Sequence, residues 1–448
     1  MTLKQRPIGI DLFAGAGGMS LGFEQAGFDI RAAIDIDPIH ASVHKFNFPE
    51  CEVIPRSVIG LSAEDIRDAA KLHVQQIDVV FGGAPCQGFS LIGQRALDDP
   101  RNALAREFVR ITAELGANYF VFENVKGLTL GKHKRFLVEM AEAFDEFGYE
   151  VVLPWEVLNA THFGVPQNRQ RLFLLGARKG LRLPDYPARL TASPRACEDS
   201  ELPRGPTCLD ALGDLPEAEE YSELIDGDAV LTDGWGEPSG YARELRCLSN
   251  DAWHFGYPRN WDRSVLTSSK RTNHTEISRG RFSETDPANV EPISRFFKLG
   301  ADGLSNTLRA GTDAARGAFT SPRPIHYERD RCVTVREMAR LHGFPDWFRF
   351  HETKWHGARQ IGNSVAPPVA RAVAVEIVRA LDIRPRRPDR SLNLGSVDLL
   401  RLDMSKAANY WGIPVPIGKR DRKSGARKRK QGEIEAERME TASPAQDA

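Results

Sequence analysis

Short apolar runs that alternate with helix-like stretches constrain the fold of this chain more than any other feature. Strands that alternate with helices form a parallel sheet with helices on both faces. The sequence therefore predicts an α/β fold with a doubly wound, mostly parallel sheet of the Rossmann-like type. The apolar runs are PIGIDLF (7–13), DIRAAIDID (29–37), QIDVVFGG (76–83), ANYFVFENV (117–125) and RLFLLGARK (171–179), and a clear helical pattern occupies 133–148.

The first four runs lead into residues that suit binding or chemistry. Gly15 follows the first run, Asp35 ends the second, Cys86 follows the third, and Glu123 ends the fourth. Ligands of open parallel sheets bind beyond the carboxyl ends of the strands. We therefore expect these four residues to meet at one edge of the sheet.

A glycine-rich turn, Gly15-Ala16-Gly17-Gly18, follows the first run, and the acid Asp35 ends the second. A glycine-rich turn with an acid about twenty residues later is typical of nucleotide binding, with the acid on the ribose hydroxyls. Because GAGG lacks the full G-x-G-x-x-G pattern, a smaller adenosine ligand is favoured over a dinucleotide. The alternative is a tight strand-to-helix turn that binds nothing.

Cys86 lies in FGGAPCQGFS, directly after Pro85 in a loop rich in glycine. A structural cysteine usually lies among apolar neighbours, so this position favours a reactive thiol. The nucleophile is the thiolate, and a free cysteine has a pKa of about 8.5, so Cys86 needs backbone amides or a cation nearby. The alternative is an inert, buried cysteine.

Glu123 ends the apolar run YFVFENV. Desolvation beside Phe120 and Phe122 would raise the pKa of its carboxyl and suit it to hold and deliver a proton. The alternative is a carboxylate that faces solvent.

Further along, the sequence QNRQR places Arg169 and Arg171 at strand-like spacing on one face, which suits an anion or a base carbonyl. The alternative there is an exposed strand start.

The composition favours a water-soluble protein of more than one domain. The chain has 448 residues, of which 41% are hydrophobic and 27% charged, and its net charge is −1. Because it has neither a long apolar run nor a signal-peptide core, we expect no membrane span and a cytoplasmic location. The six cysteines form no C-x-x-C pair, so we expect no metal site and a reducing compartment.

Changes in sequence texture divide the chain into three parts. We expect a catalytic domain at 1–185 plus 355–385, and a smaller domain of short strands and long loops at 186–354. Residues 386–448 form a C-terminal extension that we expect to be largely disordered, although the pattern near SVDLLRLDMSKAANYWG is compatible with order. Its basic stretch, 419–430, either follows a phosphate backbone or is a solvated tail.

Six sequence blocks, in order, resemble the signature blocks of DNA (cytosine-5) methyltransferases of the bacterial restriction–modification type. The resemblance covers roughly residues 8–180 and 331–380 and implies S-adenosylmethionine as cofactor and double-stranded DNA as substrate. The unmatched residues between them occupy the slot in which this family holds its target recognition region. The blocks are DLFAGAGGMSLGFEQAGF, GGAPCQGFS, FENV, QNRQR, RCVTVREMARLHGFPDWF and QIGNSVAPPVA.

The resemblance implies a cofactor site built from both ends of the chain. Phe13 would pack on the adenine, and Asp35 would bind the ribose. Ser57 stands where the family often has an Asp that touches adenine, which leaves that contact open. The other implied cofactor-binding residues are Gly15, Gly17, Gly18, Pro85, Asn363 and Ser364.

The resemblance also implies the catalytic residues. Cys86 would be the nucleophile, Glu123 the acid that engages the cytosine ring, and Arg171 the contact to the cytosine carbonyl oxygen, with Arg169 beside it. Covalent attack at carbon 6 makes carbon 5 of the ring nucleophilic, and the base must first be flipped out of the duplex. The loop 91–104, which contains Gly93, Arg95 and Arg101, would act as the lid.

Other functions remain open at this point. An RNA cytosine methyltransferase would use the same apparatus, although the large unmatched region suits duplex reading better. A non-catalytic regulator that binds the cofactor or DNA is opposed by the intact set of Cys86, Glu123 and Arg171, and a plain Rossmann oxidoreductase does not require Pro-Cys-Gln. Within the leading interpretation we expect a monomer in the nucleoid and a cognate restriction endonuclease with the same target site.

The segment between Tyr257 and Thr320 is expected to select the DNA sequence. Arginine has the donors that read guanine edges, while Ser, Thr and Asn suit base edges and phosphates. The sequence does not distinguish base-reading from phosphate-binding arginines here. The candidates are Arg259, Arg263, Arg271, Arg279, Arg281, Arg309 and Arg316.

Overall fold

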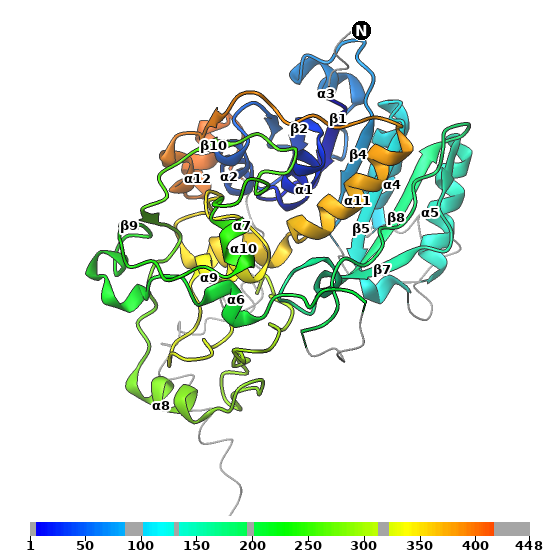
Figure 1. Ribbon diagram of the computed structural model, residues 1–448. Helices are drawn as coiled ribbons and strands as arrows, with labels where there is room; N and C mark the ends of the chain where they lie inside the picture. The colour runs from blue at the N-terminus through cyan, green and yellow to red at the C-terminus, as the bar shows by residue number, and fades with distance from the viewer. Residues whose placement is uncertain (1–5, 86–101, 130–133, 195–200, 312–321, 416–448) are drawn as a thin grey trace, which may run out of the picture.

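The computed structural model describes residues 6–85, 102–129, 134–194, 201–311 and 322–415 (Figure 1). Its central sheet has eight strands, of which β1 to β5 are parallel, while β8 is antiparallel to β5 and pairs with β6 and β7. This arrangement confirms the predicted mostly parallel α/β fold. The sheet order is β3 (Glu52–Ile54), β2 (Asp29–Ile34), β1 (Ile8–Leu12), β4 (Val79–Gly82), β5 (Tyr119–Val125), β8 (Gln170–Arg178) and β6 (Tyr149–Val151), with β7 (Glu156–Asn159) also on β8.

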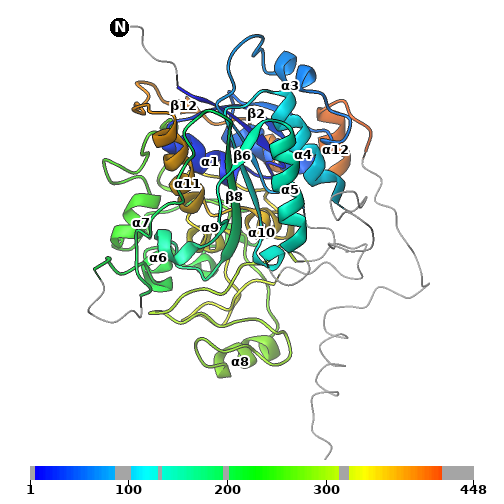
Figure 2. The ribbon, with the colours of Figure 1, turned by 90° about the vertical axis from the view of Figure 1, so that its right-hand side faces the viewer.

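Both faces of the sheet are apolar because successive strand residues point to opposite sides. On β5, Tyr119 and Val121 enter one buried cluster, whereas Phe120 and Phe122 enter the other. Helices cover both clusters, as the edge-on view in Figure 2 shows. The first face carries α1 (Gly18–Ala26), α2 (Pro38–Asn47) and α11 (Pro367–Ala380), and the second carries α3 (Ala63–Ala69), α4 (Ala103–Glu114) and α5 (Lys134–Glu146).

Local sequence signals explain where several helices begin. Asp37 caps α2 by accepting a hydrogen bond from the backbone of Ile39 at 2.9 Å, and Pro38 is the first helical residue. Ser62 and Asp65 form a reciprocal capping box at the start of α3. Thr334 and Glu337 do the same for α9 (Val335–Leu341).

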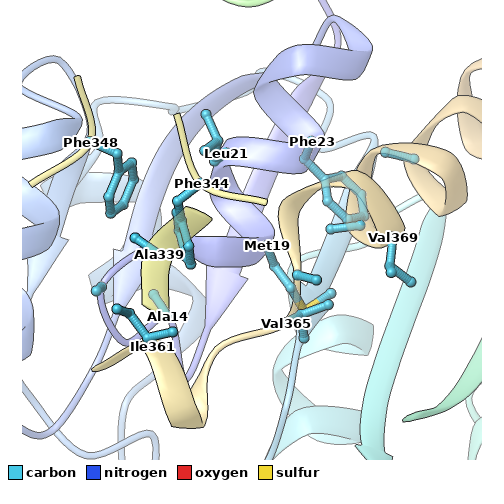
Figure 3. Close-up of a cluster of buried hydrophobic side chains, with 14 of the residues drawn as sticks. Ala14, Met19, Leu21, Phe23, Ala339, Phe344, Phe348, Ile361, Val365 and Val369 are labelled. Carbon is cyan, nitrogen blue, oxygen red and sulfur yellow. The ribbon is translucent and has the colours of Figure 1, made fainter. Parts of the chain in front are cut away.

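Helices α1 and α11, which are far apart in the sequence, lie directly against each other. Figure 3 shows Met19 and Phe23 of α1 beside Val365 and Val369, which come from the far end of the chain. A Cβ placed on Gly22 would lie 2.5 Å from Ala370 Cβ and 2.6 Å from the backbone nitrogen of Arg371. Glycine is therefore required at Gly22 for this close approach of two helices.

Residues 186–354 form a lobe of short elements joined by long connections, while the predicted division into domains stays a prediction. Its core is continuous with that of the sheet, because Leu308, Val333 and Met338 belong to the same buried cluster as Met19. In Figure 1, α8 lies far from the sheet at the end of this lobe. The elements are α6 (Cys208–Leu212), α7 (Gly240–Leu245), α8 (Glu276–Glu284), α9, and the two-residue strands β9 (Val230–Leu231), β10 (Arg259–Asn260) and β11 (Val265–Leu266), followed by α10 (Lys354–Asn363).

The C-terminal extension is ordered up to residue 415, which includes the SVDLLRLDMSKAANYWG segment whose pattern is compatible with order, while the disorder expected for the remainder lies outside the described residues. In the described part, β12 (Leu392–Asn393) pairs with β10, and the 3-10 helix η8 (Val397–Leu400) and α12 (Met404–Tyr410) contact α2. Its apolar residues, such as Leu400 and Ala407, are fully buried. The burial of these few apolar residues stabilises the segment, although most of its residues are polar. The basic stretch 419–430 lies outside the described residues.

Within the described ranges, none of the helices combines the length and the apolar character that crossing a membrane would require.

The contact between α1 and α11 gives the first prediction. Gly22→Ala should lower the free energy of unfolding by about 1–3 kcal/mol, because the methyl group would overpack a filled interface. Chemical denaturation monitored by circular dichroism measures this. Gly280→Ala is the matched control, since nothing lies within 4 Å of a Cβ at this exposed position of α8, and it should be neutral or stabilising. Equal effects of the two substitutions would contradict the proposed role of Gly22.

Candidate active site

A cavity of about 700 Å³ lies beyond the carboxyl ends of the parallel strands, where α10 also ends. This volume suits a small-molecule site. Of the predicted residues, Gly17 and Arg169 are not part of its lining, and Cys86 lies outside the described residues. The predicted residues that line it are Phe13, Gly15, Gly18, Asp35, Ser57, Pro85, Glu123, Arg171, Asn363 and Ser364.

Asp35 is fixed at the end of β2 by backbone donors. Its two carboxylate oxygens accept hydrogen bonds from Gly15 N and Asp37 N, each at 2.8 Å. Although burial opposes ionisation, these bonds and the contact with His40 lower the pKa of the Asp35 carboxyl. Asp35 is therefore an ionised acceptor at the wall of the cavity, as a residue that binds hydroxyl groups must be.

His40, one turn into α2, is a lining residue that the sequence reasoning missed. Its Nδ1 lies 3.7 Å from Asp35 Oδ1 and its Nε2 lies 3.8 Å from Asp37 Oδ2. Burial disfavours the charged ring, but the carboxylates of Asp37 and Asp35 outweigh it and raise the pKa of His40 to about 9. The only sequence signal for the contact of His40 with Asp35 and Asp37 is its position three residues after Asp37.

Apolar side chains surround the opening of the cavity near Asp35. Phe13 has a φ of +66°, which is rare for a residue other than glycine. Ile36 and Ile59 also line the cavity, yet they are 64% and 57% exposed. Ser57 lies between them in the lining and accepts a hydrogen bond from Ile59 N through its hydroxyl oxygen at 3.1 Å. These residues can sandwich a flat, apolar group such as a purine ring.

The other end of the cavity holds the ion pair of Glu123 and Arg171. Arg171 Nε lies 3.0 Å from Glu123 Oε1, and Glu123 is 8% exposed. Burial raises the pKa of the Glu123 carboxyl, and the positive charges of Arg171 and Arg169 oppose this rise without cancelling it. The predicted cause was wrong in one respect: Phe120 and Phe122 lie on the opposite face of the sheet.

Glu123 instead lies against the loop that leads to Pro85. A Cβ on Gly83 would overlap the carboxylate of Glu123, so the second glycine of the FGGAP sequence makes room for this acid. The neighbouring side chain of Asn124 donates a hydrogen bond to Ala84 O at 3.0 Å. The end of β5 therefore supplies the acid and also anchors the loop that precedes Cys86.

The structure corrects the prediction for Arg169. Its side chain does not share a face with Arg171, because it turns inward before β8 begins and is 2% exposed. Its guanidinium donates hydrogen bonds to the backbone oxygens of Leu308, Gly362 and Ser364 at 2.8–2.9 Å. Arg169 thus holds the lobe and the end of α10 against β8 and does not face the cavity.

Gly17 does not line the cavity, in contrast to its predicted role in cofactor binding; it packs against Phe48 and His44 of the α2 region instead.

Asp11 also lines the cavity, and the sequence reasoning missed it. Burial raises the pKa of its carboxyl to about 8, while the hydrogen bond from Ser20 Oγ at 2.6 Å opposes the rise. No sequence signal distinguishes Asp11 from an ordinary strand residue.

The sequence matches a described protein family. The family described as C-5 cytosine-specific DNA methylase matches residues 9–379. The chain is 55% identical to the type II methyltransferase M.XorII of Xanthomonas oryzae pv. oryzae, over 92% of this chain and 94% of that protein. It is 32% identical to the type II methyltransferase M.DdeI of Desulfomicrobium norvegicum, over 82% of this chain and 88% of that protein.

Solved structures are similar as well. A putative DNA modification methyltransferase encoded within a prophage of E. coli superposes with a TM-score of 0.66 and 31% sequence identity, covering 84% of this chain and all of that one. The S. pombe Dnmt2 methyltransferase superposes with a TM-score of 0.50 at 18% identity, over 85% of this chain and all of that one, and shares the fold.

The charges around Asp35 give a prediction on pH. The pKa of His40 is raised from 6.5 to about 9 in the folded state. Its stabilising contribution is therefore complete below about pH 6.5 and is lost as the pH rises to about 9. The difference in free energy of unfolding between the wild type and His40→Gln should shrink over this range by up to about 3 kcal/mol.

Chemical denaturation at several pH values between 6 and 9.5 measures this difference. The control is His73→Asn, since His73 is exposed and lies away from the cavity lining; its difference from the wild type should not vary. A constant difference for His40→Gln would show that folding does not raise the pKa of His40.

Proposed function

Because the chain belongs to the C-5 cytosine-specific DNA methylase family, we propose that it methylates carbon 5 of a cytosine that is flipped out of double-stranded DNA, with S-adenosylmethionine as methyl donor. The chain is a DNA (cytosine-5) methyltransferase. Beyond this, we propose the methyl donor, the flipping of the target cytosine and a covalent intermediate. One observation carries it: a single cavity joins the Asp35 end to the Glu123–Arg171 end, with Pro85 in its lining.

The residues of the first half fit S-adenosylmethionine. Phe13, Ile36 and Ile59 offer an apolar place for the adenine, beside the ionised Asp35 for the ribose hydroxyls. Asn363 and Ser364 line the same cavity and offer polar groups for the methionine part. When bound there, the cofactor supplies a methyl group activated by its positively charged sulfur.

The second half fits a cytosine ring. Burial raises the pKa of the Glu123 carboxyl, which favours its protonated form, and in that form Glu123 could donate to ring nitrogen 3. Arg171 lies within 3.0 Å of Glu123 and can donate to the neighbouring carbonyl oxygen. Together these groups draw electrons from the ring, which makes carbon 6 easier to attack.

Cys86, directly after Pro85 in the sequence, is proposed as the nucleophile. Its thiolate would add to carbon 6, and the electron pair of the 5,6 double bond would move to carbon 5, which would take the methyl group as the donor leaves as a neutral thioether. A base next removes the proton from carbon 5, and the carbon–sulfur bond breaks to restore the thiolate. Because Glu123 and Arg171 lie inside a cavity, the cytosine must leave the base stack to reach them. The lid proposed for 91–104 lies for the most part outside the described residues.

We propose a restriction–modification role, since the similar proteins are named as type II methyltransferases. In that role the enzyme would act as a monomer and share its target site with a cognate restriction endonuclease. The RNA methyltransferase and the non-catalytic regulator are less well supported, because the family is one of DNA methylases and Glu123 and Arg171 are paired in the cavity.

The structure narrows the arginines that could read DNA. Arg259 is excluded, because its side chain is fully buried and pairs with Glu24 at 2.8 Å. Arg279 and Arg281 form ion pairs with Glu219 and Glu291. Arg271 donates to a backbone oxygen at 3.4 Å, and Arg316 lies outside the described residues.

Arg309 is the best supported candidate. It is exposed, and its backbone packs on Gly362, which lines the cavity. The preceding residue, Leu308, accepts a hydrogen bond from the buried Arg169. The backbone of Arg309 is therefore held beside the proposed active site, and its exposed side chain could contact DNA there.

The covalent step is tested with DNA that contains 5-fluorocytosine at the target site. We expect a band of protein linked to DNA on a denaturing gel, because fluorine at carbon 5 cannot leave as a proton and the carbon–sulfur bond cannot break. Cys86→Ser should form no such band and transfer no methyl group, while it still binds cofactor and DNA in an equilibrium assay. Methylation by this variant at the wild-type rate would refute the mechanism.

Sequence choice is tested by alanine substitution of Arg309 and, separately, of Arg263, the other exposed candidate among the described arginines. If Arg309 reads a base, Arg309→Ala should lose about 1–3 kcal/mol of discrimination at one position of the site. Bisulfite sequencing of a methylated random-sequence library measures this. Arg259→Ala should instead destabilise the protein, because it leaves Glu24 buried without its partner. If Arg309→Ala keeps the wild-type stringency, the reader lies elsewhere in the lobe, for example in 186–256.

A further inference from the structure

The C-terminal extension touches one wall of the proposed cofactor cavity and the segment that leads into the other, although it lies beyond the residues that the family matches. One wall is the first turn of α2, which follows Asp35. The other wall is α10, which ends at Asn363. Residues 390–412 cross from one to the other on the outside of the cavity, and we call this segment the strap.

At the first wall, the strap holds the start of α2 through Trp411. The indole Nε1 donates to Pro38 O at 3.3 Å and to Ser42 Oγ at 3.0 Å, and Ser42 Oγ itself donates to Pro38 O at 2.7 Å. Pro38 follows Asp37, whose backbone nitrogen binds Asp35. The position of this turn therefore decides where the Asp35 carboxylate points.

The strap also lies along the rest of α2. Gly395 N donates to Phe46 O at 2.9 Å, at the far end of the helix. Leu399 and Leu400 are buried in the same cluster as Val43 and Phe46. These contacts hold α2 at both ends, so the helix cannot shift along its axis without breaking them.

At the second wall, the strap holds the approach to α10 through His351. His351 Nε2 lies 3.0 Å from Leu402 O, and Leu400 O accepts a hydrogen bond from Glu352 N at 3.0 Å. The backbone nitrogen of His351 donates to Gln360 Oε1 at 3.0 Å, and Gln360 lines the cavity. A displacement of the strap would therefore move a lining residue on this side too.

We propose that the strap sets the spacing of the two walls of the cofactor cavity, with Trp411 and His351 as its positioning residues. The proposal rests on the proposed use of S-adenosylmethionine. Neither residue touches the cavity itself, so the strap acts on cofactor binding through α2 and α10. Preorganised walls reduce the ordering that binding would otherwise require.

The test is Trp411→Phe in the full-length protein, since phenylalanine keeps an aromatic ring and loses the N–H donor. We expect the Kd for S-adenosylmethionine, measured by titration calorimetry, to rise about 5-fold, in keeping with the loss of a hydrogen bond. The KM for the cofactor should rise similarly, while kcat at saturating cofactor and the KM for DNA stay unchanged. In the cofactor-free protein, amides of residues 39–44 should exchange faster with deuterium.

Tyr410→Phe is the matched control, because Tyr410 is the adjacent, 55% exposed residue and should leave all five readouts unchanged. His351→Phe tests the other wall independently and should also weaken cofactor binding. A merely structural role would lower the melting temperature of free and cofactor-bound protein equally with the Kd unchanged, which would overturn the proposal. If the wild type itself binds no S-adenosylmethionine, the proposed function fails instead.

Discussion

The close contact between α1 and the segment that enters α11 is the constraint on which the rest of the site depends. A Cβ on Gly18 would lie 2.5 Å from Val365 O, and one on Gly22 would meet Ala370 and Arg371, so side chains at these positions would separate the two helices. Because β1 ends directly before α1, this contact brings Asn363 and Ser364 to the same cavity as Phe13 and Gly15. Arg169 stabilises this junction, because its guanidinium donates hydrogen bonds to the carbonyls of Leu308, Gly362 and Ser364. The group therefore has a structural role. One cavity thus forms from residues that are more than 300 positions apart in the sequence.

Carboxyl groups around this cavity differ in charge because their surroundings differ. Asp35 is surrounded by backbone donors and by His40, and its pKa is lowered. Asp11 has little besides Ser20 to offset burial, so its pKa rises to about 8. For Glu123, burial raises the pKa of the carboxyl, and Arg171 opposes the rise. Carboxyl groups whose environments separate their pKa values can take separate roles: one accepts hydrogen bonds from hydroxyls as an anion, and another can carry a proton to a substrate.

The sequence predicts the fold and most of the site because both depend on local patterns. Apolar runs followed by glycine or an acid locate β1, β2, β4 and β5. Gly15, Asp35 and Glu123 line one cavity, whereas Cys86 lies outside the described residues and its place there stays a prediction. The sequence failed where a side chain's direction depends on distant packing. Arg169 and Arg171 have strand-like spacing, yet the chain before β8 is not a strand, and Arg169 turns inward. Arg259 looked like a surface arginine, but its partner Glu24 is 235 residues away. The extension looked polar, and only its contact with α2 shows which few residues are buried.

Different contacts hold the two ends of the cavity in place: the Asp35 end, where we propose that the cofactor binds, and the Glu123 end, where we propose that the cytosine reacts. The chemical half is set by sheet register: Gly82 pairs with Phe122, so Glu123 stands opposite Gly83, and Asn124 ties Ala84 in place. Pro85, which precedes Cys86 in the sequence, lines the same cavity. At the other end, β2 is paired with β1 and β3 up to Ile34, but the turn beyond it, Asp35 to Asp37, also depends on α2, which Trp411 and the strap hold. A change in the strap can therefore alter the cofactor half while the strand pairing that positions Glu123 stays intact.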